Sequence, residues 1–202
     1  TSDINLSATF NTYQNLTRYN YNGINYDLKD DGTASVSEGT YGSPGTSGLS
    51  GDITISNTVI DNNGLSYSVT SIGNSAFGGC NALTNITIPD SVTSIGENAF
   101  SGCSNLTNIN VDQNNNYYVS EDGVLFDKNK TELIQYSAGK TNNTYIIPNS
   151  VTLIDDMAFF DCISLTNVVI PDSVTSIGSQ AFEDCDTLTD ITIPDSVTSI
   201  GD

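Results

Sequence analysis

Two segments of this 202-residue chain are nearly the same: residues 88–109 read IPDSVTSIGENAFSGCSNLTNI, and residues 170–191 read IPDSVTSIGSQAFEDCDTLTDI. The four cysteines follow the same phrase and are separated by 23, 59 and 23 residues, so a period of 23 is interrupted once by 36 additional residues. A period of this length is typical of solenoids, in which each repeat stacks only on its neighbours. The sequence therefore predicts a stack of repeats with one insertion.

Small and apolar residues recur at fixed places in each repeat. In the first repeat they are Val69, Ile72, Ala76, Phe77, Cys80, Leu83, Ile86 and Ile88, and the pattern starts again at Val92, Val151 and Val174. Burying each large side chain contributes roughly 1.5 to 3 kcal/mol. Because one repeat cannot bury this set alone, stability must come from the interfaces between neighbouring repeats.

The repeat contains three recognisable local patterns. Leu-x-x-Ile-x-Ile predicts a short strand, and proline, which cannot donate to a ladder, is expected to end it in each repeat; these prolines are Pro89, Pro148, Pro171 and Pro194. Val-x-x-Ile-Gly predicts a second extended piece, and its glycine, replaced by Asp155 in the third repeat, predicts a corner at positive φ. These corner glycines are Gly73, Gly96, Gly178 and Gly201. Ala-Phe-x-x-Cys is compact enough for a single helical turn.

This combination resembles the BspA-like branch of leucine-rich-repeat proteins. AFGGC, AFSGC, AFFDC and AFEDC follow VTSIG or VTLID and lead into LTNI, LTNV or LTDI, over about residues 69–202. The resemblance implies a curved solenoid of parallel strands, usually on secreted or surface-attached microbial proteins, and roles in adhesion, including binding to host matrix proteins. No catalytic residues carry over from it.

We therefore expect a β-rich solenoid, a leucine-rich-repeat right-handed superhelix of 23-residue repeats with short parallel strands and single helical turns. Residues 1–68 contain no repeat, and YDLKDDGTASVS predicts a strand, an Asp-Gly turn and a strand, so we expect a β-rich N-terminal cap there. Residues 39–51 are rich in Gly, Ser and Thr and predict a loop. The solenoid would span residues 69–202.

The additional residues predict a β-hairpin or small meander beside the stack, at about residues 112–147. Its three β-prone runs are Tyr117–Ser120, Val124–Asp127 and Thr131–Tyr136. The chain ends at Asp202, within a fifth repeat and without a visible cap. We expect either a longer protein or a partner that covers the last repeat.

Composition excludes several function classes. The net charge is −19, from five Lys and Arg against 24 Asp and Glu, and it would repel nucleic acid phosphates and anionic lipid headgroups. No apolar run approaches the roughly 18 residues of a membrane span. The chain has no His, which rules out His-based triads and imidazole ligands. The cysteines are expected to be buried free thiols, and their spacing fits no tetrahedral metal site, so we expect no metal and no cofactor.

Five outward positions turn apolar in the third repeat, directly after the insertion. Leu153, Met157, Phe160, Ile163 and Val169 stand where the first repeat has Ser71, Ser75, Gly78, Asn81 and Thr87. Either the inserted hairpin folds back over part of this surface, or the residues form an exposed patch for a partner.

Tyrosines give a second set of candidates, because all ten lie outside the repeats. Tyr13, Tyr19, Tyr21, Tyr26, Tyr41 and Tyr67 precede the first repeat, and Tyr117, Tyr118, Tyr136 and Tyr145 are in the insertion. Tyrosine favours interfaces, although such rings also cover strand edges with their hydroxyls in water. The binding candidates among them are Tyr117, Tyr118 and Tyr136.

Polar residues give a third set. Asn85, Asn108, Asn167 and Asp190 occupy one strand position and should stack as a ladder, with each amide bonded to the next repeat or free for a glycan or peptide. The fourth repeat gathers Glu183, Asp184, Asp186 and Asp190. A solvated acidic face is the usual explanation of such a group, and the alternative is a site for a cationic partner or calcium.

These observations favour a non-enzymatic binding module at the cell surface or outside the cell, part of a longer protein, that mediates protein–protein interaction or adhesion. Its partner would be an extracellular or host-surface protein, for example a matrix protein. The alternative is a carbohydrate-binding module that uses the polar strand face and tyrosines. An enzyme with paired carboxylates is disfavoured, because nothing surrounds them with an aromatic cleft.

Overall fold

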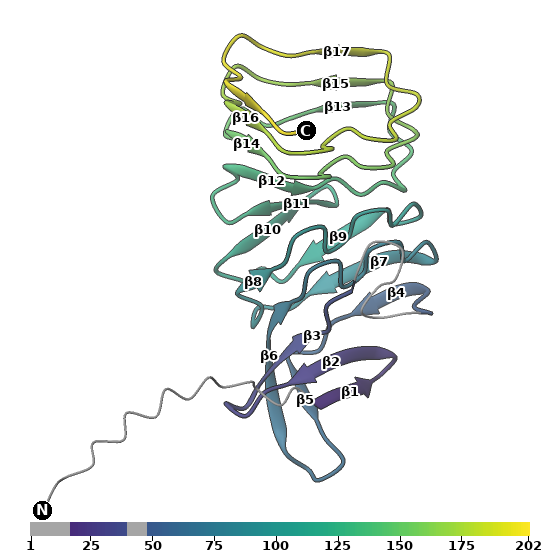
Figure 1. Ribbon diagram of the computed structural model, residues 1–202, viewed down its shortest axis with the longest axis vertical. Helices are drawn as coiled ribbons and strands as arrows, with labels where there is room; N and C mark the ends of the chain where they lie inside the picture. The colour runs from purple at the N-terminus through teal and green to yellow at the C-terminus, as the bar shows by residue number, and fades with distance from the viewer. Residues whose placement is uncertain (1–16, 40–47) are drawn as a thin grey trace, which may run out of the picture.

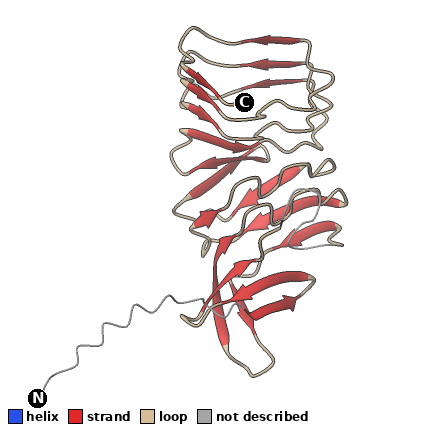
Figure 2. Cartoon of the chain, in the orientation of Figure 1, coloured by secondary structure: helices blue, strands red, loops and turns tan. Residues whose placement is uncertain are grey.

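The computed structural model describes residues 17–39 and 48–202, and the regular secondary structure in these ranges consists of β-strands (Figure 1, Figure 2). Because these residues contain no helix, none of them forms an apolar helix long enough to cross a membrane. Tyr13, Tyr41 and most of the loop predicted at residues 39–51 lie outside the described residues. The strands are β1 Thr17–Tyr21, β2 Ile24–Leu28, β3 Thr33–Val36, β4 Gly51–Thr54, β5 Thr58–Ile60, β6 Ser66–Ile72, β7 Leu83–Ile88, β8 Ser94–Ile95, β9 Asn108–Val111, β10 Tyr118–Glu121, β11 Val124–Asp127, β12 Glu132–Gln135, β13 Thr144–Ile146, β14 Leu153–Ile154, β15 Asn167–Val169, β16 Ser176–Ile177, β17 Asp190–Thr192 and β18 Ser199–Ile200.

Two columns of parallel strands run along the stack. The first column holds the strands that end each repeat, with β4, β7 and β9 in one sheet and β13, β15 and β17 in another. The second holds the short Ser-Ile strands: β3 pairs with β6 and β6 with β8, while β12, β14, β16 and β18 follow one another in a second sheet. Equivalent residues lie opposite each other, for example Ile86 and Ile109. The predicted short parallel strands are therefore present, and each turn of the chain through both columns is called a coil below.

Both columns begin before residue 69. β1, β2 and β3 form an antiparallel meander, and β3 then pairs in parallel with β6. β4 pairs in parallel with β7. β5 and β6 form an antiparallel hairpin that projects from the stack in Figure 1. β3 and β4 thus continue the two columns beyond the first repeat.

The insertion lies within the stack, so its predicted position beside the stack is wrong. β10, β11 and β12 form an antiparallel meander, and β12 pairs in parallel with β14, which places the meander between β8 and β14 (Figure 1). β13 pairs in parallel with β15 in the first column. The physical reason is that the backbone groups of β14 and β15 need partners on this side, and the insertion supplies them.

Residues 131–148 form a coil although their sequence lacks the repeat phrase. Tyr136 N donates to Ala158 O at 2.8 Å, as Phe77 N donates to Ala99 O at 2.8 Å between the first two repeats. The Tyr136 ring stacks on Phe159 with a centroid distance of 5.3 Å, in the place that phenylalanine takes elsewhere. The inserted residues therefore comprise the hairpin β10–β11 and one degenerate coil.

The core is divided at β11. Residues from Ile24 to Ile109 pack into one cluster that Leu125 joins, whereas Val124 and Phe126 join a second cluster that reaches Ala181. Alternate side chains of β11 thus face opposite halves of the stack, as expected for a strand between two packed layers. Every predicted interior residue of the first repeat is buried, and the fourth repeat is partly open after Ala181, where the next coil covers only its first part.

The four thiols are free, as predicted, and three of them are buried. Burial raises the pKa of Cys103 to about 12. Cys185 is half-buried, and the neighbouring Cys162 thiol lowers the pKa of Cys185. The column of cysteines therefore behaves as a column of small apolar residues except at Cys185.

The predicted single helical turn is wrong. The residue before the Ala-Phe pair has positive φ in all four repeats, at Ser75, Asn98, Met157 and Gln180, and a second positive φ follows at Gly79, Gly102, Asp161 and Asp184. Too few residues remain between these two positions for a helix, and the segment consists of successive turns, as in the bond from Cys80 N to Phe77 O at 2.9 Å.

The reason predicted for the corner glycines is also wrong, because Gly73, Gly96, Gly178 and Gly201 are not among the residues with positive φ. A Cβ on Gly73 would lie 2.8 Å from Glu38 N and 2.9 Å from Val36 O, both on the preceding coil. A Cβ on Gly96 would meet Asn74 in the same way. Glycine is needed for the close approach of two coils. Asp155 takes the place of this glycine in the third repeat, where the preceding segment is β12 of the insertion and not another copy of the repeat.

Candidate functional site

Two of the predicted binding residues are interior. Tyr136 is 1% exposed and forms part of the aromatic column with Phe159. Phe160 is 4% exposed and lies against the second repeat, because a Cβ on Gly102 would be 3.7 Å from its Cε1 atom. Beside it, Ser101 Oγ donates to Met157 Sδ at 3.3 Å. Packing therefore explains both Tyr136 and Phe160. Phe160 and Met157 of the third repeat lie against the second repeat.

The remaining apolar candidates of the third repeat do not form one surface. Leu153 is half-buried in β14, opposite Glu132 of β12. Ile163 and Val169 are exposed, by 52% and 44%, but Ile163 precedes the strand whereas Val169 lies at its end. Leu153 is the member of this set that pairs with the insertion, and the five residues do not form one exposed patch.

The tyrosines at the start of the insertion differ from each other. Tyr117 is 52% exposed. Tyr118 is half-buried, and its hydroxyl accepts a hydrogen bond from Ile95 N at 2.9 Å, so it satisfies the backbone of β8. Both amides are held by Asn115, a buried residue that the sequence did not single out.

The predicted polar ladder is split by the insertion. Asn85 lies opposite Asn108 in one sheet, and Asn167 lies opposite Asp190 in the other. Asn85 Nδ2 donates to the carboxylate of Asp52 on the preceding coil, whereas Asn108 Nδ2 donates to Asn110 Oδ1 on its own strand at 3.1 Å. The Gly123 turn closes against Asn108, since Ile109 N donates to Gly123 O at 3.3 Å. Asn167 and Asp190 are opposite each other on β15 and β17, away from the Gly123 turn.

The outward side of β13, β15 and β17 brings the exposed candidates together. Ile146, Val169 and Thr192 are consecutive in register, and so are Thr144, Asn167 and Asp190 (Figure 1). Ile146 is 68% exposed and Val169 44%. An apolar row therefore runs beside a polar row. We call this surface, made of Ile146, Asn167, Val169, Asp172, Asp190 and Thr192, the C-terminal strand face.

A shallow groove of about 350 Å³ lies on this face, lined by Asn167, Val169, Asp172, Asp190, Thr192 and Pro194 among others. The equivalent positions in the first half carry no apolar residue, because Thr54, Thr87 and Asn110 stand where the second half has Ile146, Val169 and Thr192. Ile146 was missed by the sequence reasoning because it lies in the insertion. The phrase Ile147-Pro148, which aligns with Ile88-Pro89, was the signal that could have found it.

The charge near this face is negative and uncompensated. Residues 141–202 contain ten Asp and Glu and no Lys or Arg. In the part of the chain that the structure describes, the carboxylates of Asp172 and Asp190 form no ion pair and accept no hydrogen bond. Partial burial and the neighbouring Asp184 and Asp186 raise the pKa of Asp161 at a separate corner.

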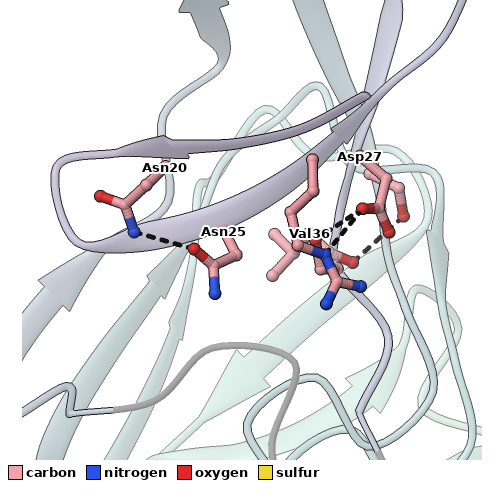
Figure 3. Close-up of polar contacts among 7 residues, drawn as sticks. Asn20, Asn25, Asp27 and Val36 are labelled. Carbon is pink, nitrogen blue, oxygen red and sulfur yellow. Dashed lines mark hydrogen bonds and ion pairs between the residues drawn. The ribbon is translucent and has the colours of Figure 1, made fainter. Parts of the chain in front are cut away.

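Four of the five basic residues bond to groups away from this face. Figure 3 shows the N-terminal meander, where Arg18 Nε lies 3.2 Å from Asp27 Oδ1 and Asn20 Nδ2 donates to Asn25 Oδ1 at 2.9 Å. Ser37 Oγ also donates to Asp27 Oδ1, at 2.9 Å, so this buried carboxylate is satisfied within the fold.

Three lysines are used within the insertion. Lys130 Nζ lies 2.9 Å from Glu121 Oε2, while Lys128 and Lys140 donate to the backbone carbonyls of Asn115 and Asp122. Lys130 thus pairs with a carboxylate of the insertion, the other two lysines bond to its backbone, and no Lys or Arg is among the residues that line the groove on the C-terminal strand face.

Comparison with known proteins places this arrangement among bacterial repeat proteins. A family model described as the BspA type leucine rich repeat region matches in six copies, over residues 54–138 and 136–202. A leucine-rich repeat protein from Eubacterium ventriosum has 27% identity and a TM-score of 0.63, over 92% of this chain and 68% of that chain. No curated protein matches the chain.

Two further solved structures are less than 25% identical and show the fold alone. The pneumococcal vaccine antigen PcpA has 18% identity and a TM-score of 0.59, over 92% of this chain and 78% of that chain. A leucine-rich repeat protein from Bacteroides ovatus has 24% identity and a TM-score of 0.52, over 91% of this chain and 55% of that chain.

Proposed function

Because this chain belongs to the BspA-type leucine-rich repeat family, we propose that it is a non-enzymatic module that binds a protein partner through the C-terminal strand face. We further propose that it acts at the cell surface or outside the cell, in adhesion, with matrix proteins as first candidates. The proposal includes a right-handed superhelix of 23-residue repeats with residues 1–68 as its N-terminal cap.

One observation carries the proposal: Ile146 and Val169 are adjacent, exposed and on the same side of paired strands. When a partner covers two neighbouring aliphatic side chains, the free energy of the system falls by roughly 25 cal/mol per Å² of apolar area removed from water. The scaffold does not require them, because Thr87 holds the same position as Val169 in the first repeat. Residues that the fold does not need and that water disfavours are typical of protein interfaces.

The magnitude follows from the exposed fractions. Full burial of an Ile or Val side chain is worth roughly 1.5 to 3 kcal/mol, and 68% and 44% of these two remain to be buried. Covering both is therefore worth about 2 to 3 kcal/mol. Because threonine keeps one methyl group, the double substitution Ile146→Thr with Val169→Thr should weaken binding by about 1.5 kcal/mol, or roughly tenfold.

The experiment uses the intact chain and a panel of immobilised extracellular matrix proteins, with binding measured by surface plasmon resonance. Saturable binding that falls about tenfold in the double variant supports the proposal. Ile163→Thr is the matched control, since Ile163 is 52% exposed but lies off the face. An equal loss in the control, or no saturable binding to any of these proteins, argues against the proposal.

Carbohydrate binding through Asn167 and Asp190 is the second candidate. Both side chains are in the groove and offer hydrogen-bonding groups. Sugar sites commonly add an aromatic ring for stacking, whereas the groove has none among the residues that line it. Signal on a glycan array that Asn167→Ala abolishes would favour this candidate over protein binding.

A further inference from the structure

On the C-terminal strand face, a groove holds two carboxylates beside Val169, and Ile146 lies next to Val169 on the paired strand. Asp172 and Asp190 line it together with Val169. As established above, these carboxylates have no cationic partner in the part of the chain that the structure describes, and residues 141–202 contain no Lys or Arg. The basic residues Arg18, Lys128, Lys130 and Lys140 are bound to other groups.

Resting on the function proposed above, we propose that the partner presents a basic segment, with Lys or Arg side chains next to aliphatic ones, to this groove. The aliphatic side chains pack on Ile146 and Val169, and the cationic head lies between Asp172 and Asp190.

Lys and Arg suit this surface because their side chains have two chemically different parts. The methylene stem covers apolar surface, while the charged head stays at the polar rim. In the groove, Val169 supplies the apolar floor and Asp172 and Asp190 supply the rim. A neutral polar head would leave both carboxylates without a counter-charge, and an acidic head would be repelled by them.

The arrangement also predicts how binding responds to salt. The two carboxylates are at the surface, where ion pairs are screened over about 8 to 10 Å at physiological ionic strength. Salt should therefore weaken binding, mainly by slowing association, while the apolar part of the contact remains.

Three synthetic peptides test the proposal by fluorescence anisotropy with the full chain. The first alternates valine with lysine, the second replaces lysine by glutamine, and the third replaces valine by serine. We expect the valine–lysine peptide to bind at least tenfold more tightly than either of the others, and to lose affinity between about 50 and about 500 mM NaCl.

Because the whole chain carries a charge of −19, a matched charge control is essential. Asp172→Asn with Asp190→Asn should weaken the valine–lysine peptide about tenfold or more, whereas Asp184→Asn with Asp186→Asn removes the same charge elsewhere and should change it less than twofold. Equal losses in the two double variants would mean attraction to the overall charge and would overturn the proposal.

The remaining outcomes separate this inference from the function on which it rests. Equal binding of the valine–glutamine peptide, independent of salt, overturns the basic partner but leaves a protein-binding face standing. No binding of the valine–lysine peptide at about 1 mM, where any contact stronger than about 4 kcal/mol would register, also overturns it. Unchanged binding in the Ile146→Thr, Val169→Thr variant counts against the face itself.

Discussion

We expect Asn115 to be the polar residue that most stabilises the start of the insertion. It is fully buried, and its Nδ2 donates to Pro89 O at 2.8 Å and to Val92 O at 2.9 Å. Its Oδ1 accepts hydrogen bonds from Tyr117 N at 2.8 Å and Tyr118 N at 2.9 Å. One amide thus joins the turn after β7, the strand that ends the first repeat, to β10, the first strand of the insertion.

Asn115→Ala removes four hydrogen bonds, two to carbonyls of the buried residues Pro89 and Val92 and two from the part-buried amides of Tyr117 and Tyr118. At about 1 kcal/mol net for each bond, the free energy of unfolding should fall by about 4 kcal/mol. This is a large part of the roughly 5 to 15 kcal/mol that stabilises a typical domain.

Urea denaturation measures the loss, and hydrogen exchange at the Tyr117 and Tyr118 amides locates it. Asn116→Ala is the control, because Asn116 is an exposed neighbour of the same type, and its variant should stay within about 0.5 kcal/mol of the parent. A loss below about 1 kcal/mol for Asn115→Ala, or amide protection that does not change, would refute the reasoning.

Three further predictions follow from close approach, burial and exposure. Gly96→Ala should lower the free energy of unfolding by about 1 to 3 kcal/mol, measured by urea denaturation, because its Cβ would meet the backbone of the preceding coil. Gly78→Ala is the control and should be tolerated, because the third repeat holds phenylalanine at this position. Similar losses in the two variants would count against close approach as the reason for glycine. Burial, with nearby carboxylates, raises the pKa of Asp155, so the folded state binds this proton more tightly than the unfolded chain, and the ionised carboxylate lowers stability above the folded pKa. Asp155→Asn should therefore raise the melting temperature at pH 7, with the gain disappearing as the pH falls below the ordinary Asp value of about 3.9; a gain that persists in acid would contradict this. Cys185, which is half-buried and has a lowered pKa, should be the first thiol to react with a thiol reagent at pH 8, and faster labelling of the buried Cys103 would contradict this prediction.

Much of the interior could be predicted from the sequence because burial leaves a periodic pattern. Residues such as Phe77, Ile86 and Cys103 must point inward in every coil, and repetition of the phrase makes that requirement visible. The strand-ending prolines were also legible: β7 ends at Ile88, directly before Pro89.

Features that depend on how two coils approach each other could not be predicted in the same way. The pattern indicates that residue 96 must be glycine, but either a positive φ or a close neighbour would explain this. The structure shows that the close neighbour is the reason. Asn115 and Asn116 are indistinguishable as letters, although one is buried with four hydrogen bonds and the other is exposed.

The candidate site shows the same division. Val169 was identified because a repeated position changed from polar to apolar, a signal that a repeat makes readable. Ile146 carries no such signal, since its coil lacks the phrase and joins the column only through backbone pairing with β15. Phe160 changed in the same way as Val169, but it fills the space beside Gly102 of the second repeat.

The most direct test of the central claim is methyl NMR on the full chain with labelled Ile and Val residues, titrated with the matrix protein fragment that binds most tightly. The account predicts that the Ile146 and Val169 methyl resonances shift or broaden on binding. Ile60 and Ile163, which are exposed by 50% and 52% at other places, should stay unchanged. Perturbations confined to Ile60 or Ile163, with Ile146 and Val169 unaffected at saturation, would contradict the claim that the C-terminal strand face is the binding surface.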